Sequence, residues 1–479
     1  MKGRCKKKKT IIIILCVIIY MIAGAIAPFV LQKDVSEKFK NQFDVNEFYG
    51  DDISVDRAKI IETNAEALSE RLRLLDKAKE KIVFDSYDLR DGESTRDTLA
   101  VLLAKAEEGV KIQILIDGIN SLIRMEGRNI FYALSSHPNV EIKLYNPLKI
   151  LQPWKTQGRM HDKYILVDDL GYILGGRNAH DSFIGGYEAK ATNIDREVLI
   201  YNSAHGTEKS KESSITELEA YIDEVWNLKE NELFHNGETV SDKPKVKKER
   251  EFLIDRYAEL QRQWQELFGE YNYEDNTLVT NKVSILSNPT HIYGKEPWVF
   301  YSLVELMNNA EDTVRIYSPY AVLDDYMLNS LRGISKNIKD FKLVINSVEN
   351  GDNLFASSDY IRNKKKIIDT GASIYEYDSG VSTHGKSVAV DDDISIIGSF
   401  NFDMRSTYVS TELMVVINSY ELTKELKENM ERMKKDSRKV INENIYETPD
   451  HIEVNKANPV KRFLWWFLGL IMSPFRFLV

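Results

Sequence analysis

Histidine, lysine and asparagine side chains recur at one spacing in two places along the chain. The segments MHDKYILVDDLGYILGGRN (160–178) and THGKSVAVDDDISIIGSFN (383–401) both follow the pattern H-x-K-x4-D-x6-G-[GS]-x-N. Each copy supplies one imidazole, one ammonium and one amide, a set that suits an anionic phosphorus centre. The repeat therefore predicts a phosphodiester site built from two matching half-sites.

Two facing half-sites permit phosphodiester exchange without a metal or a cofactor. One neutral imidazole, of His161 or His384, attacks phosphorus and forms a phosphohistidine. The other, protonated, donates to the departing alcohol oxygen and then acts as base towards the acceptor hydroxyl. Four further groups are expected to stabilise charge on the non-bridging oxygens in the transition state. These are Lys163, Lys386, Asn178 and Asn401.

An imidazole held in one tautomer needs a carboxylate or carbonyl partner, and carboxylates follow both motifs. Glu412 lies in STELMVV after the second motif, whereas Asp195 and Glu197 both lie in NIDREVLI after the first. The residues alone favour Glu412 and leave the other two open. Asp168 and Asp391, at the predicted strand ends, suit turn or cap hydrogen bonds better than catalysis.

The motifs must be positioned by strands and turns. Alternation in MHDKYILVD predicts a strand that places His161 and Lys163 on one face. The pairs at 175–176 and 398–399 are expected to turn the chain and return each asparagine to the strand end.

Helices alternate with short apolar strands around both motifs, which indicates an α/β fold. Strands are predicted at KIVFDSYDL, KIQILID and VEIKLYNP in the first half, and at TVRIYSPY, FKLVINS and ASIYEYD in the second. This repeat predicts two duplicated domains packed face to face, with a self-sufficient monomeric active site at their interface. The expected order is a cytoplasmic stub and transmembrane anchor (1–31), a spacer (32–57), domain 1 (58–207), a charged helical linker (208–280), domain 2 (281–440) and a tail (441–479).

The amino-acid composition is that of a globular protein. The 479 residues are 43% hydrophobic and 29% charged, a normal globular balance, and the net charge of -10 disfavours nucleic acid as a partner. Both cysteines lie within the first 16 residues, so no disulfide is expected in the globular part.

Both ends of the chain point to a membrane. Residues 10–31 are uncharged and as a helix would span roughly 33 Å, enough to cross a bilayer. The basic run MKGRCKKKK before them predicts a cytoplasmic N-terminus and an extracytoplasmic body in the cell membrane, as a single-pass protein. A cleaved signal peptide is disfavoured because the apolar run is too long and Pro28 would follow the cut. The tail KRFLWWFLGLIMSPFRFLV is too short to span, and its tryptophans and flanking basic residues favour an interfacial segment over a core helix.

The paired motifs resemble the signatures of the phospholipase D superfamily, over about residues 58–440. Within that superfamily, RMHDKYILVDDLGYILGGRN, the preceding SSHPNVEIKLYNP, and GSFNFDMRSTYVSTE are similar to bacterial cardiolipin synthases, particularly their shorter, C-type members. The resemblance implies two phospholipase D-like α/β sandwich domains. It also implies that one phospholipid gives its phosphatidyl group to the enzyme histidine and that the primary hydroxyl of phosphatidylglycerol accepts it.

The same resemblance implies roles for individual residues. His161 would be the nucleophile, His384 the acid and base, and Asp195 rather than Glu197 the orienting carboxylate. Gly176 departs from the family motif, which often has serine there, whereas Ser399 keeps the serine. Phosphatidylglycerol and phosphatidylethanolamine are the expected phospholipid substrates. A hydrolytic phospholipase D, in which water replaces the acceptor, and a nuclease-type phosphodiesterase remain the alternatives, and a scaffold without activity is disfavoured because both motifs are intact.

Overall fold

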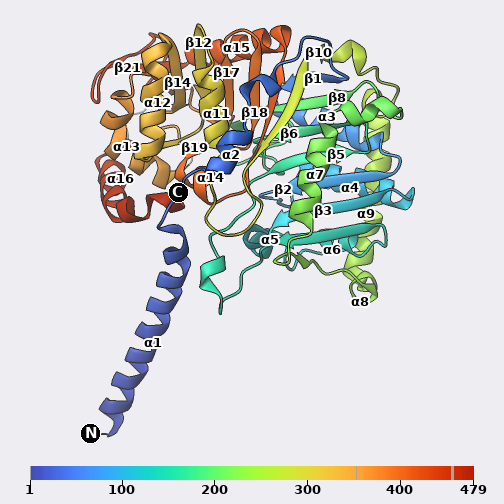
Figure 1. The fold of residues 1–479 in the computed structure, drawn as a ribbon. Coiled ribbons are helices and arrows are strands. Elements are labelled where there is room, and N and C mark those ends of the chain that lie inside the picture. Colours follow the sequence, from blue (N-terminus) through green and yellow to red (C-terminus); the bar gives the residue numbers. More distant parts are fainter. Residues whose placement is uncertain (1, 352, 455–457) are drawn as a thin grey trace.

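The body of the molecule is built on two nine-stranded sheets (Figure 1). The computed structural model describes residues 2–351, 353–454 and 458–479. The first sheet has the order β10 (Leu278–Val279), β1 (Asp56–Ile61), β8 (Glu197–Asn202), β6 (Gly171–Gly175), β5 (Lys163–Val167), β2 (Lys81–Ser86), β3 (Lys111–Asp117), β4 (Val140–Tyr145) and β9 (Glu232–Leu233).

The second sheet repeats this plan. Its order is β11 (Lys282–Ser287), β20 (Leu413–Asn418), β18 (Ile394–Gly398), β17 (Ser387–Val390), β12 (Thr313–Tyr317), β14 (Asp340–Asn346), β15 (Ser373–Tyr377), β21 (Ser437–Val440) and β22 (Tyr446–Glu447). In both sheets three consecutive strands are parallel, β2-β3-β4 and β12-β14-β15, and the motif hairpins β5-β6 and β17-β18 are antiparallel. The predicted duplication of an α/β domain is confirmed.

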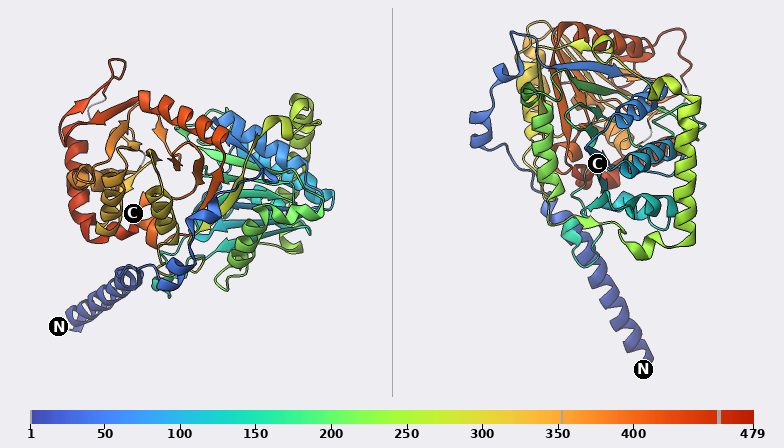
Figure 2. Two further views of the ribbon diagram at one scale, coloured as in Figure 1. Left: turned by 45° about the horizontal axis from the view of Figure 1, so that its top comes forward. Right: turned by 90° about the vertical axis from the view of Figure 1, so that its right-hand side faces the viewer.

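Helices cover the outer face of each sheet, and the inner faces pack together (Figure 2). On the first sheet these helices are α3 (Asn64–Asp76), α4 (Glu93–Glu107) and α6 (Asn129–Ser135); on the second they are α11 (Trp298–Asn308), α12 (Asp325–Asn337) and α13 (Leu354–Ile368). Between the sheets, Leu166 and Leu174 of domain 1 share one apolar cluster with Ile397 and Val415 of domain 2. Burial of each such side chain contributes about 1.5–3 kcal/mol. The domain interface is therefore a core in its own right, and the two halves do pack face to face.

The segment predicted as a charged linker, 208–280, contains α7 (Ile215–Trp226) and α9 (Pro244–Gln263). Helix α9 packs on α4 and α6. It buries Val246, Leu253 and Leu260, which recur every seven residues on one face, while its charged residues form the solvated face. Helix α7 buries its apolar face in the cluster between the sheets. The segment is therefore not a free linker: each of its two long helices packs on the body through an apolar stripe.

The N-terminal helix α1 (Lys2–Ile26) projects away from the body (Figure 1). With the following turn η1 (Ala27–Phe29) it gives the one stretch among the described residues that is long and apolar enough to cross a membrane, Lys9–Phe29. Phe29 itself is buried in the outer core of domain 2.

The tail forms a surface helix, α16 (Pro459–Met472), that packs on α13. Trp465 and Gly469 face domain 2, where a Cβ on Gly469 would lie 2.9 Å from the Ser358 carbonyl oxygen. Phe463 and Trp466 are exposed on the other face. The helix is thus attached to the protein along one side and apolar towards the outside.

Candidate active site

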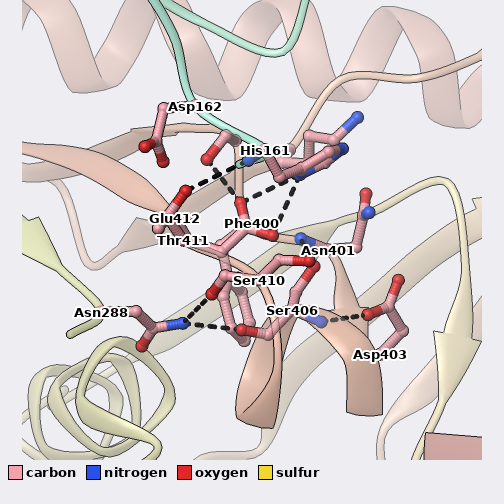
Figure 3. Close-up of polar contacts among 12 residues, drawn as sticks. His161, Asp162, Asn288, Phe400, Asn401, Asp403, Ser406, Ser410, Thr411 and Glu412 are labelled. Carbon is pink, nitrogen blue, oxygen red and sulfur yellow. Dashed lines mark hydrogen bonds and ion pairs between the residues drawn. The ribbon is translucent and has the colours of Figure 1, made fainter. Parts of the chain in front are cut away.

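The two motif histidines are each paired with a carboxylate of the other domain. His161 Nδ1 lies 2.9 and 3.1 Å from the two carboxylate oxygens of Glu412, as Figure 3 shows. His384 Nδ1 lies 2.7 Å from Asp195 Oδ2. The pairs are therefore crossed: each domain supplies one imidazole and the carboxylate for the other imidazole.

Short strand pairings between the domains produce this crossing. Met160 bridges to Thr411, and the Thr411 hydroxyl accepts a 3.2 Å hydrogen bond from the His161 amide. In the other half, β16 (Ser382–Thr383) pairs with β7 (Asn193–Ile194), and the His384 amide donates to the Ile194 carbonyl over 2.6 Å. Each histidine then follows a residue that is paired across the interface, so it comes to lie beside the carboxylate that follows the partner residue.

The prediction that the histidines lie within the motif strands is wrong by a few residues. The strands begin at Lys163 and Ser387, after each histidine. The residues before them are instead drawn to the other domain by the bridges. Each motif lysine folds back to donate to the carbonyl of its own histidine, so the imidazole and ammonium still share one side of the chain.

The motif glycines end β6 and β18, and the chain bends at the next residue, 176 and 399. The motif hairpins themselves reverse five or more residues earlier, at 168–170 and 391–393, where Asp168 and Asp391 have φ of 46° and 47°. Gly175 and Gly398 also allow close approach of the next strand. A Cβ there would lie 2.6 Å from the Arg196 carbonyl oxygen and 2.2 Å from the Leu413 carbonyl oxygen respectively.

The motif aspartates cap strand ends, as their positions predicted. The Asp168 carboxylate accepts hydrogen bonds from the backbone N–H groups of residues 79–81, over 2.6–3.0 Å. Asp391 does the same for residues 311–313, over 2.7–2.9 Å. Each aspartate therefore fixes its hairpin to the neighbouring central strand and lies away from the histidines.

The lysines and asparagines of the motif are buried in the same region. Lys386 Nζ lies 2.7 Å from His384 Nδ1, and Lys163 Nζ lies 5.2 Å from the centre of the Tyr87 ring. The side-chain oxygens of Asn178 and Asn401 are buried without a hydrogen-bond partner within the described part of the chain. A buried polar atom without a partner is costly, so both amides are suited to bind a polar ligand.

Glu197, the other carboxylate that follows the first motif, has a different role. It binds the Arg71 guanidinium through two hydrogen bonds and lies 3.4 Å from Arg177 Nε, inside domain 1. The geometry thus selects Asp195 as the partner of His384.

The two His–carboxylate pairs differ electrostatically. Burial, aided by the charges of Lys163 and Lys386, lowers the pKa of His161 well below its ordinary value, and burial raises the pKa of Glu412 to about 7. Burial acts in the same direction on Asp195, but Lys386 and His384 outweigh it and hold the pKa of this carboxyl below its ordinary value. The first pair therefore favours a neutral imidazole, whereas the second keeps an ionised carboxylate against its imidazole.

The Gly176 and Ser399 positions mark a second difference. The Ser399 hydroxyl donates to Glu412 Oε2 over 2.5 Å. A Cβ on Gly176 would lie 2.4 Å from Asp195 Oδ1, so no side chain fits there without displacing that carboxylate. The departure from serine in the first copy thus makes room for Asp195.

Sequence reasoning missed several residues around the histidines. One of them is Thr411. The other two are aromatic residues whose rings meet the imidazoles edge-on. The ring centres of Tyr87 and His161 are 5.1 Å apart, and so are those of Phe183 and His384. Tyr87 directly follows β2, so its position at the carboxyl end of a strand could have indicated a place near the site. Phe183 lies in a loop with no pattern that would have singled it out.

Comparison with known proteins agrees with this architecture. Cardiolipin synthase C of Escherichia coli (strain K12) is 26% identical over 398 residues, which cover 75% of this chain and 80% of that protein. The cardiolipin synthase of Staphylococcus aureus (strain Mu50) is 24% identical over 411 residues, covering 85% and 70%. The crystal structure of phosphatidylserine synthase from Haemophilus influenzae Rd KW20 superposes with a TM-score of 0.63 at 14% identity, covering 92% of this chain and 100% of that one, and supports the shared fold.

A family model, described as cardiolipin synthase, PLD-like domain, matches residues 72–226 and 303–434. The two segments fall on the two sheets and include both motifs. Because together they make up more than half of the chain, this protein belongs to the cardiolipin synthase family of phospholipase D-like domains.

Proposed function

We propose that this phospholipid-modifying enzyme is a membrane-anchored phosphatidyltransferase that makes cardiolipin through a phosphohistidine intermediate. The observation that carries the proposal is the crossed arrangement of two His–carboxylate pairs with opposite electrostatic bias. One pair favours a neutral imidazole for attack, and the other places an ionised carboxylate beside the imidazole that we assign to proton transfer.

In the first step the free ring nitrogen of His161 attacks the phosphorus of the donor phospholipid. The bond from phosphorus to the head-group alcohol oxygen breaks, and His384 gives its proton to that oxygen. The proton on His161 Nδ1 stays hydrogen-bonded to Glu412, whose negative charge balances the cationic phosphohistidine.

In the second step the primary hydroxyl of phosphatidylglycerol enters on the side that the head-group alcohol has left. His384, now neutral, takes its proton, the oxygen attacks phosphorus, and the N–P bond to His161 breaks. Lys163, Lys386 and the two motif asparagines stabilise the non-bridging oxygens in both steps.

The acceptor decides between transferase and hydrolase, because water in the second step would yield phosphatidic acid. The cardiolipin synthases among the relatives favour the alcohol. A nuclease-type activity is the weaker alternative, since the apolar α1 and the exposed apolar face of α16 suit a lipid substrate.

Membrane attachment is part of the proposal. Helix α1 spans the bilayer once, and the basic run before it keeps the N-terminus cytoplasmic and the body extracytoplasmic. The exposed face of α16 lies in the interface, and the duplicated halves complete the site within a monomer.

The decisive experiment follows the lipid products. The full chain, reconstituted in vesicles with labelled phosphatidylglycerol, with and without phosphatidylethanolamine, should form cardiolipin. Release of phosphatidic acid alone would make the protein a hydrolase, and cleavage of single-stranded DNA lost in His161→Ala would make it a nuclease. Absence of any lipid product would refute the proposal.

A second experiment separates the two histidines. A phospholipid with a p-nitrophenol head group needs no proton on departure, so His384→Asn should still release one burst of p-nitrophenol and accumulate the acid-labile phosphohistidine. His161→Asn should give no burst. Equal bursts from both variants, with unchanged melting temperatures, would contradict the assignment of His161 as nucleophile.

A further inference from the structure

The loop between β4 and β5 carries an apolar tip that is exposed to solvent. Ile150 is 66% and Leu151 82% exposed, and Leu148 and Trp154 are exposed beside them. The charged residues from 147 to 157 are Lys149 and Lys155, whose ammonium groups lie 2.8 Å from Glu232 and 3.5 Å from Glu230 of the body. Both charges of the loop are thus paired with the body, and the side chains of Ile150 and Leu151 expose apolar surface.

This loop contacts the transmembrane helix itself. The Tyr20 hydroxyl of α1 donates a 2.9 Å hydrogen bond to the Leu151 carbonyl. Gly24 of α1 lies directly against Pro153, where a Cβ would come within 2.6 Å of the proline Cγ. Figure 1 shows the loop beside the part of α1 nearest the body.

The position of these contacts along α1 gives the depth of the loop. The apolar span runs from Lys9 to Phe29, 21 residues, which as a helix is about the thickness of the hydrocarbon layer. The last residue of the span, Phe29, is buried in domain 2, so the depth is measured from Ile26, where α1 ends. Gly24 and Tyr20 come two and six residues before Ile26, or about 3 and 9 Å along the helix axis. Residues that contact α1 there lie below the level of the head groups if α1 crosses the bilayer.

We propose that residues 147–157 form a loop that inserts into the outer leaflet beside α1. The occupant of its apolar surface is the lipid bilayer, because the loop is continuous with the segment of α1 that must lie in lipid. The inference rests on the proposed span of α1, but it does not depend on which alcohol accepts the phosphatidyl group.

The loop is connected directly to the active site. At its end, Gln157 accepts from Arg405 through its side-chain and backbone oxygens over 3.3 and 3.1 Å, and Met160 and His161 follow within four residues. At its start, Pro147 packs against Gly118, where α5 (Gly118–Arg124) begins, and α5 exposes Leu122 and Ile123 nearby. Insertion would therefore hold the site at the head-group level, where a phospholipid reaches His161 without leaving the bilayer.

Depth-dependent quenching tests the insertion on the full chain. In a background with both native cysteines replaced by serine, an environment-sensitive label is attached to Leu151→Cys, to Ile13→Cys in α1, or to Ile53→Cys beside β1, at the other end of the body. The variants are reconstituted in phosphatidylglycerol and phosphatidylethanolamine vesicles with brominated acyl chains. We expect quenching at positions 13 and 151 and none at 53.

The outcomes separate this inference from the proposed anchor. Quenching at 13 but not at 151 would overturn the inserted loop and leave the span intact. Lack of quenching at both positions would refute the span and the inference with it. The label at position 151 could also respond to protein concentration and not to brominated lipid. That result would place the loop tip in a contact between two copies of the protein and would also overturn the proposal.

A charge at the tip tests the consequence for catalysis. Leu151→Asp is expected to lower turnover of bilayer substrate at least about tenfold, since burying a carboxylate in hydrocarbon is costly. Turnover of a short-chain phospholipid dissolved as monomers should stay unchanged, and Ile53→Asp is the matched control for both substrates. Equal turnover of bilayer substrate by the two variants would count against insertion, whereas loss on the monomeric substrate would assign the loop to the site itself.

Discussion

Replacing Glu412 by glutamine should slow phosphatidyl transfer about a thousandfold while leaving the protein folded. Both carboxylate oxygens lie within 3.1 Å of His161 Nδ1, so the centres of the imidazole and carboxylate charges would be about 4 Å apart once the ring carries phosphorus. Opposite unit charges at that distance attract by about 4 kcal/mol at an effective dielectric constant of about 20. Loss of that attraction corresponds to about three factors of ten in rate.

The pH dependence gives the sharper readout. The pKa of Glu412 is raised to about 7 by burial, whereas that of His161 lies well below 6.5. The acid limb of kcat/KM for the native enzyme should therefore fall near pH 7 and report the carboxyl group, because the imidazole is already neutral there. Glu412→Gln should remove this limb.

Glu197→Gln is the matched control, since Glu197 is also buried but its carboxylate pairs with Arg71 and Arg177 of domain 1. It should lower the melting temperature and keep the acid limb. If Glu412→Gln turned over at the native rate, or kept an acid limb near pH 7, the carboxylate would not be the charge partner of His161 and the reasoning would fail.

Stability should respond to the same group with a defined sign. The folded-state pKa of Glu412 lies above its ordinary value of 4.5, so its contribution is fully present below pH 4.5 and is lost as the pH rises through about 7. A shift of this size corresponds to about 3 kcal/mol. Melting curves of Glu412→Gln should therefore lose less stability than the native protein over that pH range.

Three other perturbations follow from the site and its supports. Gly176→Ala places a Cβ 2.4 Å from Asp195 Oδ1 and should reduce turnover at least about tenfold. Ser399→Gly removes only one hydroxyl and should reduce turnover less. A larger loss of turnover in Ser399→Gly than in Gly176→Ala would contradict the steric argument. Asp168→Ala and Asp391→Ala each remove three backbone hydrogen bonds, so each should lower the unfolding free energy by about 1–3 kcal/mol, by similar amounts, with kcat of the folded enzyme unchanged. EDTA should leave turnover unaffected, because the buried lysines supply the positive charge, and inhibition reversed only by added metal would refute the two-histidine chemistry.

Much of the fold was predictable because local patterns determine it. KIQILID is a strand over residues 111–117 in both prediction and structure, and the capping role of Asp168 and Asp391 followed from their place after an apolar run. Duplication was predictable because the motif and the strand before it recur in the same order.

What remained unpredicted depends on contacts between the halves. Nothing in the spacing of H-x-K indicates that His161 takes its carboxylate from the other domain, or that Met160 bridges to Thr411 and the strand begins only at Lys163. Likewise, the sequence does not show that Gly175 is also needed because β8 approaches it so closely. The stripe of α9 was hidden because its three buried residues are separated by charged residues and by exposed apolar ones such as Phe252 and Ile254.

The crossed pairs can form only after both domains have been synthesised. A growing chain that has folded its first sheet already contains His161 and Asp195, yet neither has its partner. The first pair closes only when Glu412 has been added, near the end of translation. On the proposed mechanism, an incomplete chain lacks both completed pairs, and activity begins only once both halves have been made and have met.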